Sequence, residues 1–412
     1  MRGILRAATA FAAVLVLAFA LTSRPATANS RDVETLALLW SRSDGHNATM
    51  WSVRWSPNGT MLSTTFFDNT TVIWNSTTGQ RIMKLGSHEN RTSEPRTRCD
   101  GNSTCTIPEH LPTRITAWSP DGKYLAIGGD DTLIHVYNTS TWTLHRILRG
   151  HKGSVLTLDF SPDGRYLASG SGTDKVSMHN VPENMIKIWD FERGVAIANL
   201  TGHRDGVMEV RWSRNGSRLV SASDDKTLKM WDTATWNNTI NFTGHAGGVL
   251  AVDWSPDETK LISGSRDYKA RLWNATSGEL IATWQAPNCI RSVDWHFNNQ
   301  IIVTSGVSEV MVMIRNSTSG VVIKTLDSNR GPAGPRGAIM SARWSPDGKM
   351  LATASGKEGT VRVYAFGLAT PPTIPLIPPW VPGVVGFGGV IAGSSLVTAK
   401  FILRGSAKIG RR

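Results

Sequence analysis

A short phrase, Trp-Ser-Pro-Asp-Gly or a close variant, recurs along this chain and constrains its fold more than any other feature. Its copies begin at Trp55, Trp118, Phe160, Trp212, Trp254, Trp295 and Trp344. Proline presets φ and Asp-Gly or Asn-Gly supplies the turn after it, so each copy marks a tight turn. Alternating apolar runs flank the phrase, as at 154–160 and 166–169, and such runs are typical of strands. Units of about 42 residues match a blade of four strands. The sequence therefore predicts an all-β, seven-bladed β-propeller.

Two further signatures accompany the phrase. Gly-His pairs open several units, at His151, His203 and His245, and Trp-Asp closes two of them, at Trp189 and Trp231. With these signatures the chain resembles the WD-repeat (WD40) family over residues 33–366. The resemblance implies that polar groups inside a blade satisfy one another and make it rigid. The sets implied are His203, Ser221, Asp225 and Trp231 in one unit, and His245, Ser263, Asp267 and Trp273 in the next.

The last two units depart from this pattern. Asn288 stands where Gly-His is expected in the sixth, with Arg315 at the Trp position, and Tyr364 replaces Trp in the seventh. These units should lack the hydrogen-bonded set and be less stable. The seventh unit also ends after its third strand. Residues 33–41 are therefore predicted to complete the last blade as its outer strand, which removes a free edge.

The two ends of the chain predict export and membrane anchoring. Residues 1–28 have a basic start, a short apolar run and an Ala-x-Ala site, which indicate a signal peptide cleaved after Ala28. An uncleaved anchor is the alternative. After the propeller, at 29–369, come a Pro-rich linker at 370–382, an apolar segment at 383–403 and a basic tail at 404–412. The apolar segment is predicted to span the membrane with the tail in the cytoplasm, although a flexible or surface-lying segment remains possible.

The net charge of +12 follows from these ends. Residues 1–28 hold three basic residues and 400–412 hold five, with no acidic residue in either segment. The remaining chain has 36 basic and 32 acidic residues. We therefore expect no nucleic-acid partner, despite a pI near 9.9.

The cysteines and histidines indicate no metal or cofactor site. Cys99 and Cys105 flank a polar loop and are predicted to form a local disulfide, as suits an exported protein. Cys289 has no evident partner and is predicted to be a buried thiol. No Cys/His cluster has metal-ligand spacing. No nucleophile elbow, phosphate-binding loop or haem signature is present, so we expect no enzymatic activity.

One face of the propeller collects the irregular features. This "top" face carries the loops between the second and third strands of a blade and the loops between blades. Three insertions, at 89–112, 171–185 and 327–338, map to it. The position four residues before each phrase is predicted to line the top of the central channel, and it holds Trp51, Arg114, Leu156, Met208, Leu250, Arg291 and Met340. Trp51, Arg114, Met208, Arg291 and Met340 are candidate partner-binding residues, because Trp, Arg and Met are enriched in interfaces. Tolerated length variation and ordinary channel lining are the alternatives.

Asn-x-Ser/Thr sequons are unusually frequent. They occur at Asn47, Asn58, Asn69, Asn75, Asn90, Asn102, Asn138, Asn199, Asn215, Asn237, Asn241, Asn274 and Asn316. In an exported protein they predict N-glycosylation, although turns favour Asn, Ser and Thr in any case. Six lie in turns of the opposite, "bottom" face: Asn58, Asn75, Asn138, Asn215, Asn274 and Asn316. Glycans there would leave the top face to partners, but the division is not clean, because four sequons are predicted on the top side: Asn47, Asn69, Asn90 and Asn102.

These features together predict a non-catalytic recognition protein at the cell surface. It would bind a protein, peptide or glycan through the top face and be held to the membrane by its C-terminal helix. The alternatives are an extracytoplasmic propeller enzyme, either a hydrolase or a cofactor-binding protein, and a structural protein of the cell envelope.

Overall fold

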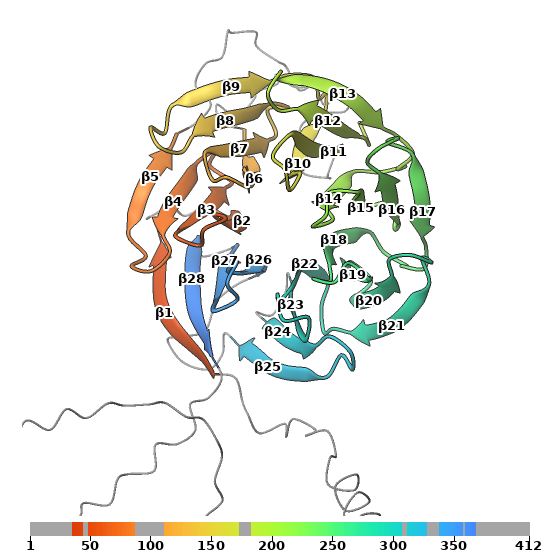
Figure 1. Ribbon diagram of the computed structural model, residues 1–412. Helices are drawn as coiled ribbons and strands as arrows, with labels where there is room; N and C mark the ends of the chain where they lie inside the picture. Colours follow the sequence, from red (N-terminus) through yellow and green to blue (C-terminus); the bar gives the residue numbers. More distant parts are fainter. Residues whose placement is uncertain are drawn as a thin grey trace, which may run out of the picture. The chain divides into compact units, whose positions relative to one another are not determined.

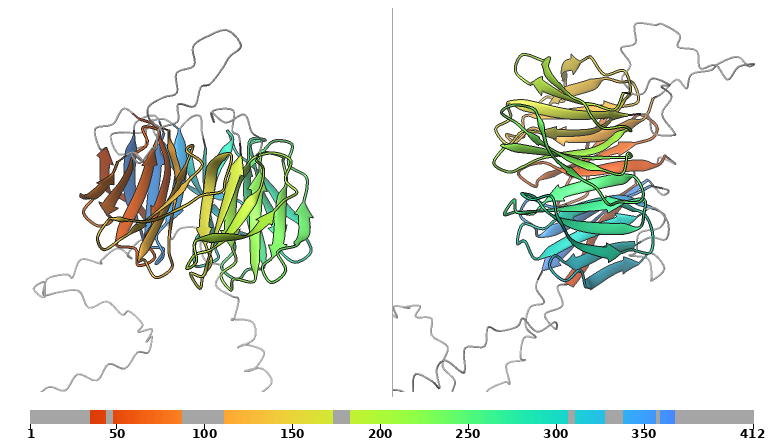
Figure 2. Two further views of the ribbon diagram at one scale, coloured as in Figure 1. Left: turned by 90° about the horizontal axis from the view of Figure 1, so that it is seen from above. Right: turned by 90° about the vertical axis from the view of Figure 1, so that its right-hand side faces the viewer.

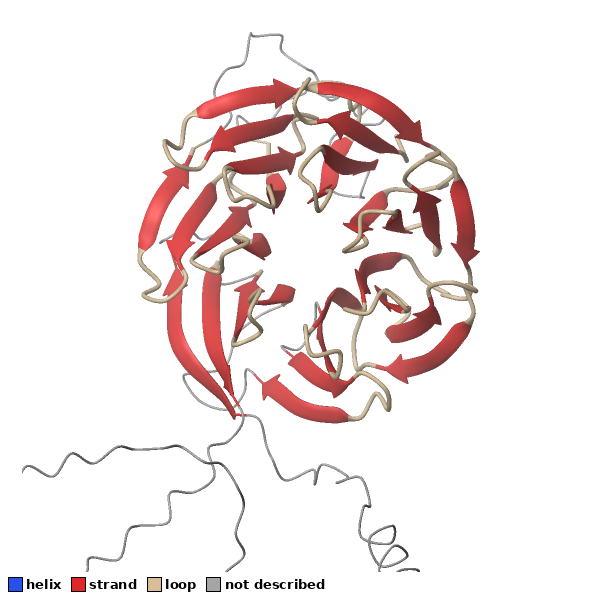
Figure 3. Cartoon of the chain, viewed as in Figure 1, coloured by secondary structure: helices blue, strands red, loops and turns tan. Residues whose placement is uncertain are grey.

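The computed structural model describes residues 35–43, 48–86, 111–172, 183–306, 311–327, 338–356 and 359–367. These residues form seven four-stranded antiparallel sheets, which are the blades of a ring around a central channel (Figure 1). All their regular elements are strands (Figure 3). Accordingly, no helix in the described ranges is long and apolar enough to cross a membrane. The segments at 1–28, 370–382, 383–403 and 404–412, the Cys99–Cys105 pair and most of the three insertions lie outside the described residues.

The first four blades follow one another along the chain. Blade 1 contains β2 (Met50–Trp55), β3 (Met61–Phe66), β4 (Thr71–Asn75) and β5 (Arg81–Leu85). Blade 2 contains β6 (Thr113–Trp118), β7 (Tyr124–Gly129), β8 (Ile134–Asn138) and β9 (Leu144–Leu148). Blade 3 contains β10 (Ser154–Phe160), β11 (Tyr166–Gly172), β12 (Ile186–Asp190) and β13 (Val195–Leu200). Blade 4 contains β14 (Val207–Trp212), β15 (Arg218–Ser223), β16 (Leu228–Asp232) and β17 (Asn238–Phe242).

The remaining blades close the ring. Blade 5 contains β18 (Val249–Trp254), β19 (Lys260–Ser265), β20 (Lys269–Asn274) and β21 (Leu280–Gln285). Blade 6 contains β22 (Ile290–Trp295), β23 (Ile301–Gly306), β24 (Met311–Asn316) and β25 (Val322–Asp327). Blade 7 contains β26 (Ile339–Trp344), β27 (Met350–Ser355), β28 (Thr360–Gly367) and, as its outer strand, β1 (Thr35–Ser43).

The burial of each strand follows from its place in the blade. The second strands are almost wholly buried, as in β15 and β19, because both of their faces pack against neighbouring blades. Outer strands such as β5 and β17 are exposed over most of their length. The apolar cores lie between blades, and one of them joins Trp40, Val361 and Val363 of blade 7 to Val53 and Phe66 of blade 1. Figure 2 shows the ring of blades from two sides.

The repeated phrase forms the turn between the first and second strands. At 118–122, the Ser119 hydroxyl donates to the Asp121 carboxylate at 2.6 Å, and this carboxylate accepts the backbone N–H of Lys123 at 3.1 Å. Gly122 follows at φ 71°, a left-handed conformation that glycine adopts without a steric cost. Ser119, Asp121 and Gly122 of the phrase thus each have a local role in reversing the chain.

The strand predicted at 33–41 lies at Thr35–Ser43. It pairs antiparallel with β28, from Thr35 opposite Gly367 to Ser43 opposite Thr360. Trp40 is buried, and its indole N–H donates to the carbonyl of Ser76 in blade 1 at 2.8 Å. Strand β1 therefore ties the first and last blades together.

Candidate binding site at the mouth of the central channel

A β-bulge in the first strand of every blade builds the rim of the channel. In β2 the pairing skips from Met50 to Ser52, and in β22 it skips from Ile290 to Ser292. A bulged residue is left out of the ladder, and the bulge re-aims its side chain. The seven bulged residues are Trp51, Arg114, Leu156, Met208, Leu250, Arg291 and Met340. We call this ring the channel mouth.

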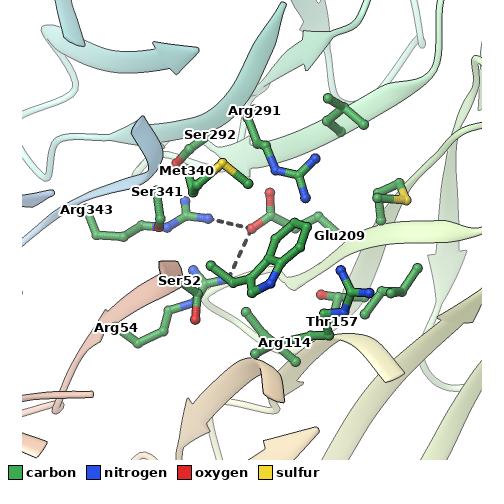
Figure 4. Close-up of a pocket in the computed structure, with 15 residues that line it drawn as sticks. Ser52, Arg54, Arg114, Thr157, Glu209, Arg291, Ser292, Met340, Ser341 and Arg343 are labelled. Carbon is green, nitrogen blue, oxygen red and sulfur yellow. Dashed lines mark hydrogen bonds and ion pairs between the residues drawn. The ribbon is translucent and has the colours of Figure 1, made fainter. Parts of the chain in front are cut away.

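The channel mouth surrounds a cavity that is open to solvent (Figure 4). All seven mouth residues line this cavity, including the five candidate partner-binding residues. Below them the lining continues with Ser52, Arg54, Ile115, Thr157, Glu209, Ser292, Ser341 and Arg343. The structure thus brings together residues that the sequence spreads over almost 300 positions.

Trp51 is the centre of a cationic, aromatic arc. The Arg114 guanidinium carbon lies 4.4 Å from the centroid of the indole, and that of Arg291 lies at 4.8 Å. The indole also stacks with Phe67 at 6.3 Å, and Phe67 itself is 41% exposed. Arg114 is held by a bidentate pair with Asp130, at 2.8 and 2.7 Å. Cation–π contacts of this kind are favourable by about 0.5–2 kcal/mol and fix the planes of the groups involved.

The opposite arc of the mouth is apolar. Leu156, Met208 and Leu250 come from blades 3, 4 and 5, which follow one another around the ring. Leu156 and Met208 are partly exposed, whereas Leu250 is only 5% exposed. A ligand at the mouth would therefore meet cations on one side and aliphatic side chains on the other.

Glu209 forms the floor of the cavity. Its Oε1 atom accepts from Arg54 at 3.2 Å and from Arg343 at 2.6 Å (Figure 4), and it lies 2.7 Å from Arg211. Its Oε2 atom accepts the backbone N–H of Val252 at 3.0 Å. Burial alone would raise the pKa of Glu209, but attraction to the three arginines lowers it to about 2. One carboxylate from blade 4 thus joins groups from blades 1, 5 and 7 across the channel.

A second ring of charges lies at the position directly before each phrase. Its charged members are Arg54, Asp159, Arg211, Asp253, Asp294 and Arg343. Each of the three aspartates accepts the backbone N–H of the next blade's Trp, as in the 2.7 Å bond from Trp295 to Asp253. Burial, reinforced by repulsion from Asp294, raises the pKa of Asp253. These aspartates link neighbouring blades.

The polar sets inside the blades are structural. In blade 4 the Trp231 N–H donates to Ser221 at 2.9 Å, Ser221 bonds His203 at 2.8 Å, and His203 bonds Asp225 at 2.8 Å. Blade 5 repeats the set with His245, Ser263, Asp267 and Trp273. All of these groups are directed at one another within a blade. They do not line the cavity.

Blade 3 contains a third set that the sequence analysis missed. His151 bonds Ser169 at 2.6 Å and Glu183 at 3.1 Å, and Trp189 donates to Ser169 at 2.8 Å. Glu183 takes the place that Asp225 has in blade 4, although it lies within the insertion at 171–185. In blade 6, Arg315 takes the Trp position and donates to the carbonyls of Gly320 and Gln285, at 3.0 and 2.9 Å.

Two predictions about single residues need correction. Asn69 is only 6% exposed and adopts φ 68° in the turn after β3, so in the folded protein it is not accessible to a glycan. Cys289 is partly exposed rather than buried. The sequons at Asn47, Asn90 and Asn102 lie outside the described residues.

Four of the six bottom-face sequons share one local geometry. The Asn274 side-chain oxygen accepts the backbone N–H groups of Thr276 and Ser277, at 2.8 and 2.9 Å. The corresponding asparagines at 75, 138 and 316 accept in the same way. The turn therefore uses the amide oxygen, while a glycan would be attached to the nitrogen. Asn58, Asn199, Asn215, Asn237 and Asn241 are exposed.

Comparisons with known proteins agree with the fold. The family model "WD domain, G-beta repeat" matches residues 38–75, 101–138, 142–190, 194–232, 236–274 and 321–365. FIZZY-RELATED 2 of Arabidopsis thaliana is 26% identical over 50% of this chain and 37% of its own length. The B-type cell cycle switch protein ccs52A of Medicago truncatula is 25% identical over 48% of this chain and 36% of its own length. The nuclear distribution protein PAC1 of Coccidioides posadasii is 33% identical over 45% of this chain and 38% of its own length. The chain thus spans less than half the length of these relatives.

Proposed function

The chain belongs to the WD-repeat family, and from that premise we propose that it is a non-catalytic recognition protein that binds a protein or peptide partner at the channel mouth. The observation that carries this proposal is the mouth itself. Seven bulges place an indole, two guanidiniums and aliphatic side chains around one open cavity. Of these, Trp and Arg are the residue types enriched among the residues that dominate binding energy in interfaces.

The other polar groups of the ring support this choice of surface. The histidines of blades 3, 4 and 5 are each bonded to a serine and a carboxylate inside their own blade. The channel aspartates bond backbone N–H groups of the next blade. These groups hold the scaffold together, whereas Trp51, Leu156, Met208 and Arg291 of the mouth are partly exposed, which supports the mouth as the binding surface.

We further propose that the propeller acts outside the cell, as a glycosylated protein held to the membrane by residues 383–403. The apolar composition of this segment, the basic tail at 404–412 and the signal-like residues 1–28 support the proposal. The sequon density supports it as well, because exposed asparagines such as Asn58 and Asn215 lie on the face opposite the mouth.

Site-specific photo-crosslinking in the native cell tests the binding surface. A photoreactive side chain at Met208 should capture a discrete partner, and Trp51→Ala should abolish that capture. The same group at Thr235, in a bottom-face turn, is the matched control. Equal capture at Thr235, or capture at Met208 that survives Trp51→Ala, would contradict the assignment of the mouth.

Protease treatment of intact cells tests the location. An external propeller should be released from the cells, and glycosidase treatment should increase its electrophoretic mobility. A propeller that stays protected until the cells are lysed would exclude the external location.

A further inference from the structure

The outer strand of every blade contains a β-bulge. In β21 the pairing with β20 skips from Ala282 to Leu280, and in β25 the pairing with β24 skips from Lys324 to Val322. A bulge re-aims the residue that it leaves out of the ladder and protects the strand edge against pairing with another strand. The seven residues left out are all exposed: Leu39, Ile82, His145, Ile197, Thr239, Ile281 and Ile323. We therefore expect this outer wall to bind through its side chains rather than by adding a strand.

The outer wall is most apolar on blades 5 and 6. Leu280 and Ile281 of β21, together with Val321, Val322 and Ile323 in and directly before β25, are 39–63% exposed. We call these five residues the aliphatic patch. The matching residues 237–239 of blade 4 are Asn, Asn and Thr. The patch is therefore a feature of two blades and not of the repeat.

Arg315 holds the two strands of the patch together. It stands where blades 4 and 5 have the Trp of their polar sets, but it donates beyond its own blade, to the carbonyl of Gln285 at the end of β21, at 2.9 Å. It also donates to the carbonyl of Gly320, in the turn before β25, at 3.0 Å. Gly320 in turn lies against the indole of Trp284 in β21. Strands β21 and β25 are thus fixed as neighbours on the wall (Figure 1).

The aliphatic patch is large enough for the centre of a stable interface. Five such side chains, each about half exposed, present roughly 400 Å² of apolar surface, which is within the range of the largest apolar patch on a typical monomer. A standard interface buries about 800 Å² per partner, and somewhat more than half of this area is apolar. The patch by itself supplies the apolar part of one such interface.

The charges beside the patch make it complementary to itself. Glu279 directly precedes Leu280 in blade 5, and Lys324 directly follows Ile323 in blade 6. The two strands occupy equivalent places in adjacent blades, so the two charges lie at opposite corners of the patch. A two-fold axis in the wall, midway between these corners, sets Lys324 of each copy against Glu279 of the other. A partner with charges of one sign would satisfy only one of the two corners.

The sequons on the outer strands lie on other blades. Asn199 and Asn241 are exposed on β13 and β17 of blades 3 and 4, whereas β21 and β25 contain no sequon. Asn274 and Asn316, which precede these two strands, lie in bottom-face turns. Glycans on the outer strands would therefore cover blades 3 and 4 and leave the patch open.

We propose that the aliphatic patch binds a second copy of this chain, so that the protein is a two-fold dimer through the outer walls of blades 5 and 6. The five aliphatic side chains of each copy form the centre of the interface, and a Glu279–Lys324 pair closes it at each side. The interface shares no residue with the channel mouth, so the dimer presents two mouths.

Reciprocal charge reversal tests the two-fold pairing. Energy transfer between two differently labelled samples of the full-length chain, purified in detergent, gives the dissociation constant of the dimer over a dilution series. Glu279→Lys alone and Lys324→Glu alone each bring like charges together at two places, so each variant should associate with itself at least about tenfold more weakly. A mixture of the two variants should restore the affinity, because each lysine then meets a glutamate. Glu192→Lys, the same charge change in an exposed bottom-face turn of blade 3, should leave the affinity unchanged.

A matched pair of bulge variants tests the apolar centre. Ile281→Asp should abolish the energy transfer, whereas Ile197→Asp, at the equivalent and similarly exposed bulge of blade 3, should preserve it. Both variants should have the same free energy of unfolding in urea, which separates loss of the dimer from loss of the fold.

Three results would overturn the inference. The unmodified chain would be shown to lack the dimer if it gave no energy transfer at concentrations up to about 100 μM. Transfer that survives Ile281→Asp, as association through residues 383–403 would, excludes the aliphatic patch. Charge variants that stay equally weak when mixed, or that associate like the unmodified chain, exclude the two-fold pairing.

Discussion

Replacing Glu209 by glutamine should destabilise the whole ring, because this carboxylate joins blade 4 to Arg54 in blade 1 and to Arg343 in blade 7. Folding lowers the pKa of Glu209 from its ordinary 4.5 to about 2. Since one pKa unit corresponds to about 1.4 kcal/mol, the ionised form contributes about 3 kcal/mol to the free energy of unfolding. Removing one member of a buried ion pair costs about 3–5 kcal/mol, which agrees with that value.

The pH dependence of this loss follows from the direction of the shift. A carboxylate whose pKa is lowered by folding contributes its full stability above pH 4.5, and the contribution is lost as the pH falls towards 2. Urea unfolding followed by tryptophan fluorescence should therefore show a loss of about 3 kcal/mol for Glu209→Gln at pH 7, and a smaller loss at pH 3. The control is Glu192→Gln, an exposed residue whose backbone carbonyl, not its carboxylate, accepts from Arg146. An equal effect of both substitutions at pH 7, or a loss that is the same at both pH values, would refute the reasoning.

Three further predictions concern the links within and between blades. Asp253→Asn should raise Tm by about 2–4 °C at pH 8 and by less at pH 4. Folding raises the pKa of Asp253, so its ionised form opposes folding as the pH rises. A gain in Tm that is larger at pH 4 would contradict this. Ser221→Ala should lower the free energy of unfolding in urea by about 1–3 kcal/mol, because the Trp231 N–H and the His203 ring lose their shared partner. The control is Ser217→Ala, in an exposed bottom-face turn. Trp40→Ala should lower the free energy of unfolding by about 3–5 kcal/mol. Leu39→Ala changes a neighbouring side chain that is 49% exposed, and it should lower this free energy by less than about 1 kcal/mol. Equal losses would argue against β1 as a stabilising strand.

Features that repeat along the chain could be predicted from it. The phrase marks each first turn, so counting back four residues from Trp55 or Trp295 gives Trp51 and Arg291 of the mouth. The count works because every first strand carries its bulge at the same place. The shared geometry thus turns a sequence offset into a position in space.

Features that occur once could not be predicted in this way. Glu209 is an ordinary strand residue in the sequence, and two of the three arginines that hold it, Arg54 and Arg343, lie more than 130 positions away. Glu183 escaped notice because an insertion separates it from His151, the residue it bonds. Neither pairing has a fixed spacing, since both depend on how the blades meet after folding.

The pairing of β1 with β28 has a consequence for biosynthesis. Thr35 lies opposite Gly367, and at about 5–20 residues per second a ribosome needs roughly 15–65 s to make the chain between them. During this time the backbone groups of β1 have no strand beside them, while the blades between can already form. An unpaired strand edge is a template for pairing with another chain. Ring closure is therefore a late step in synthesis, and a chain interrupted before Thr360 would leave β1 open to a strand of a neighbouring molecule.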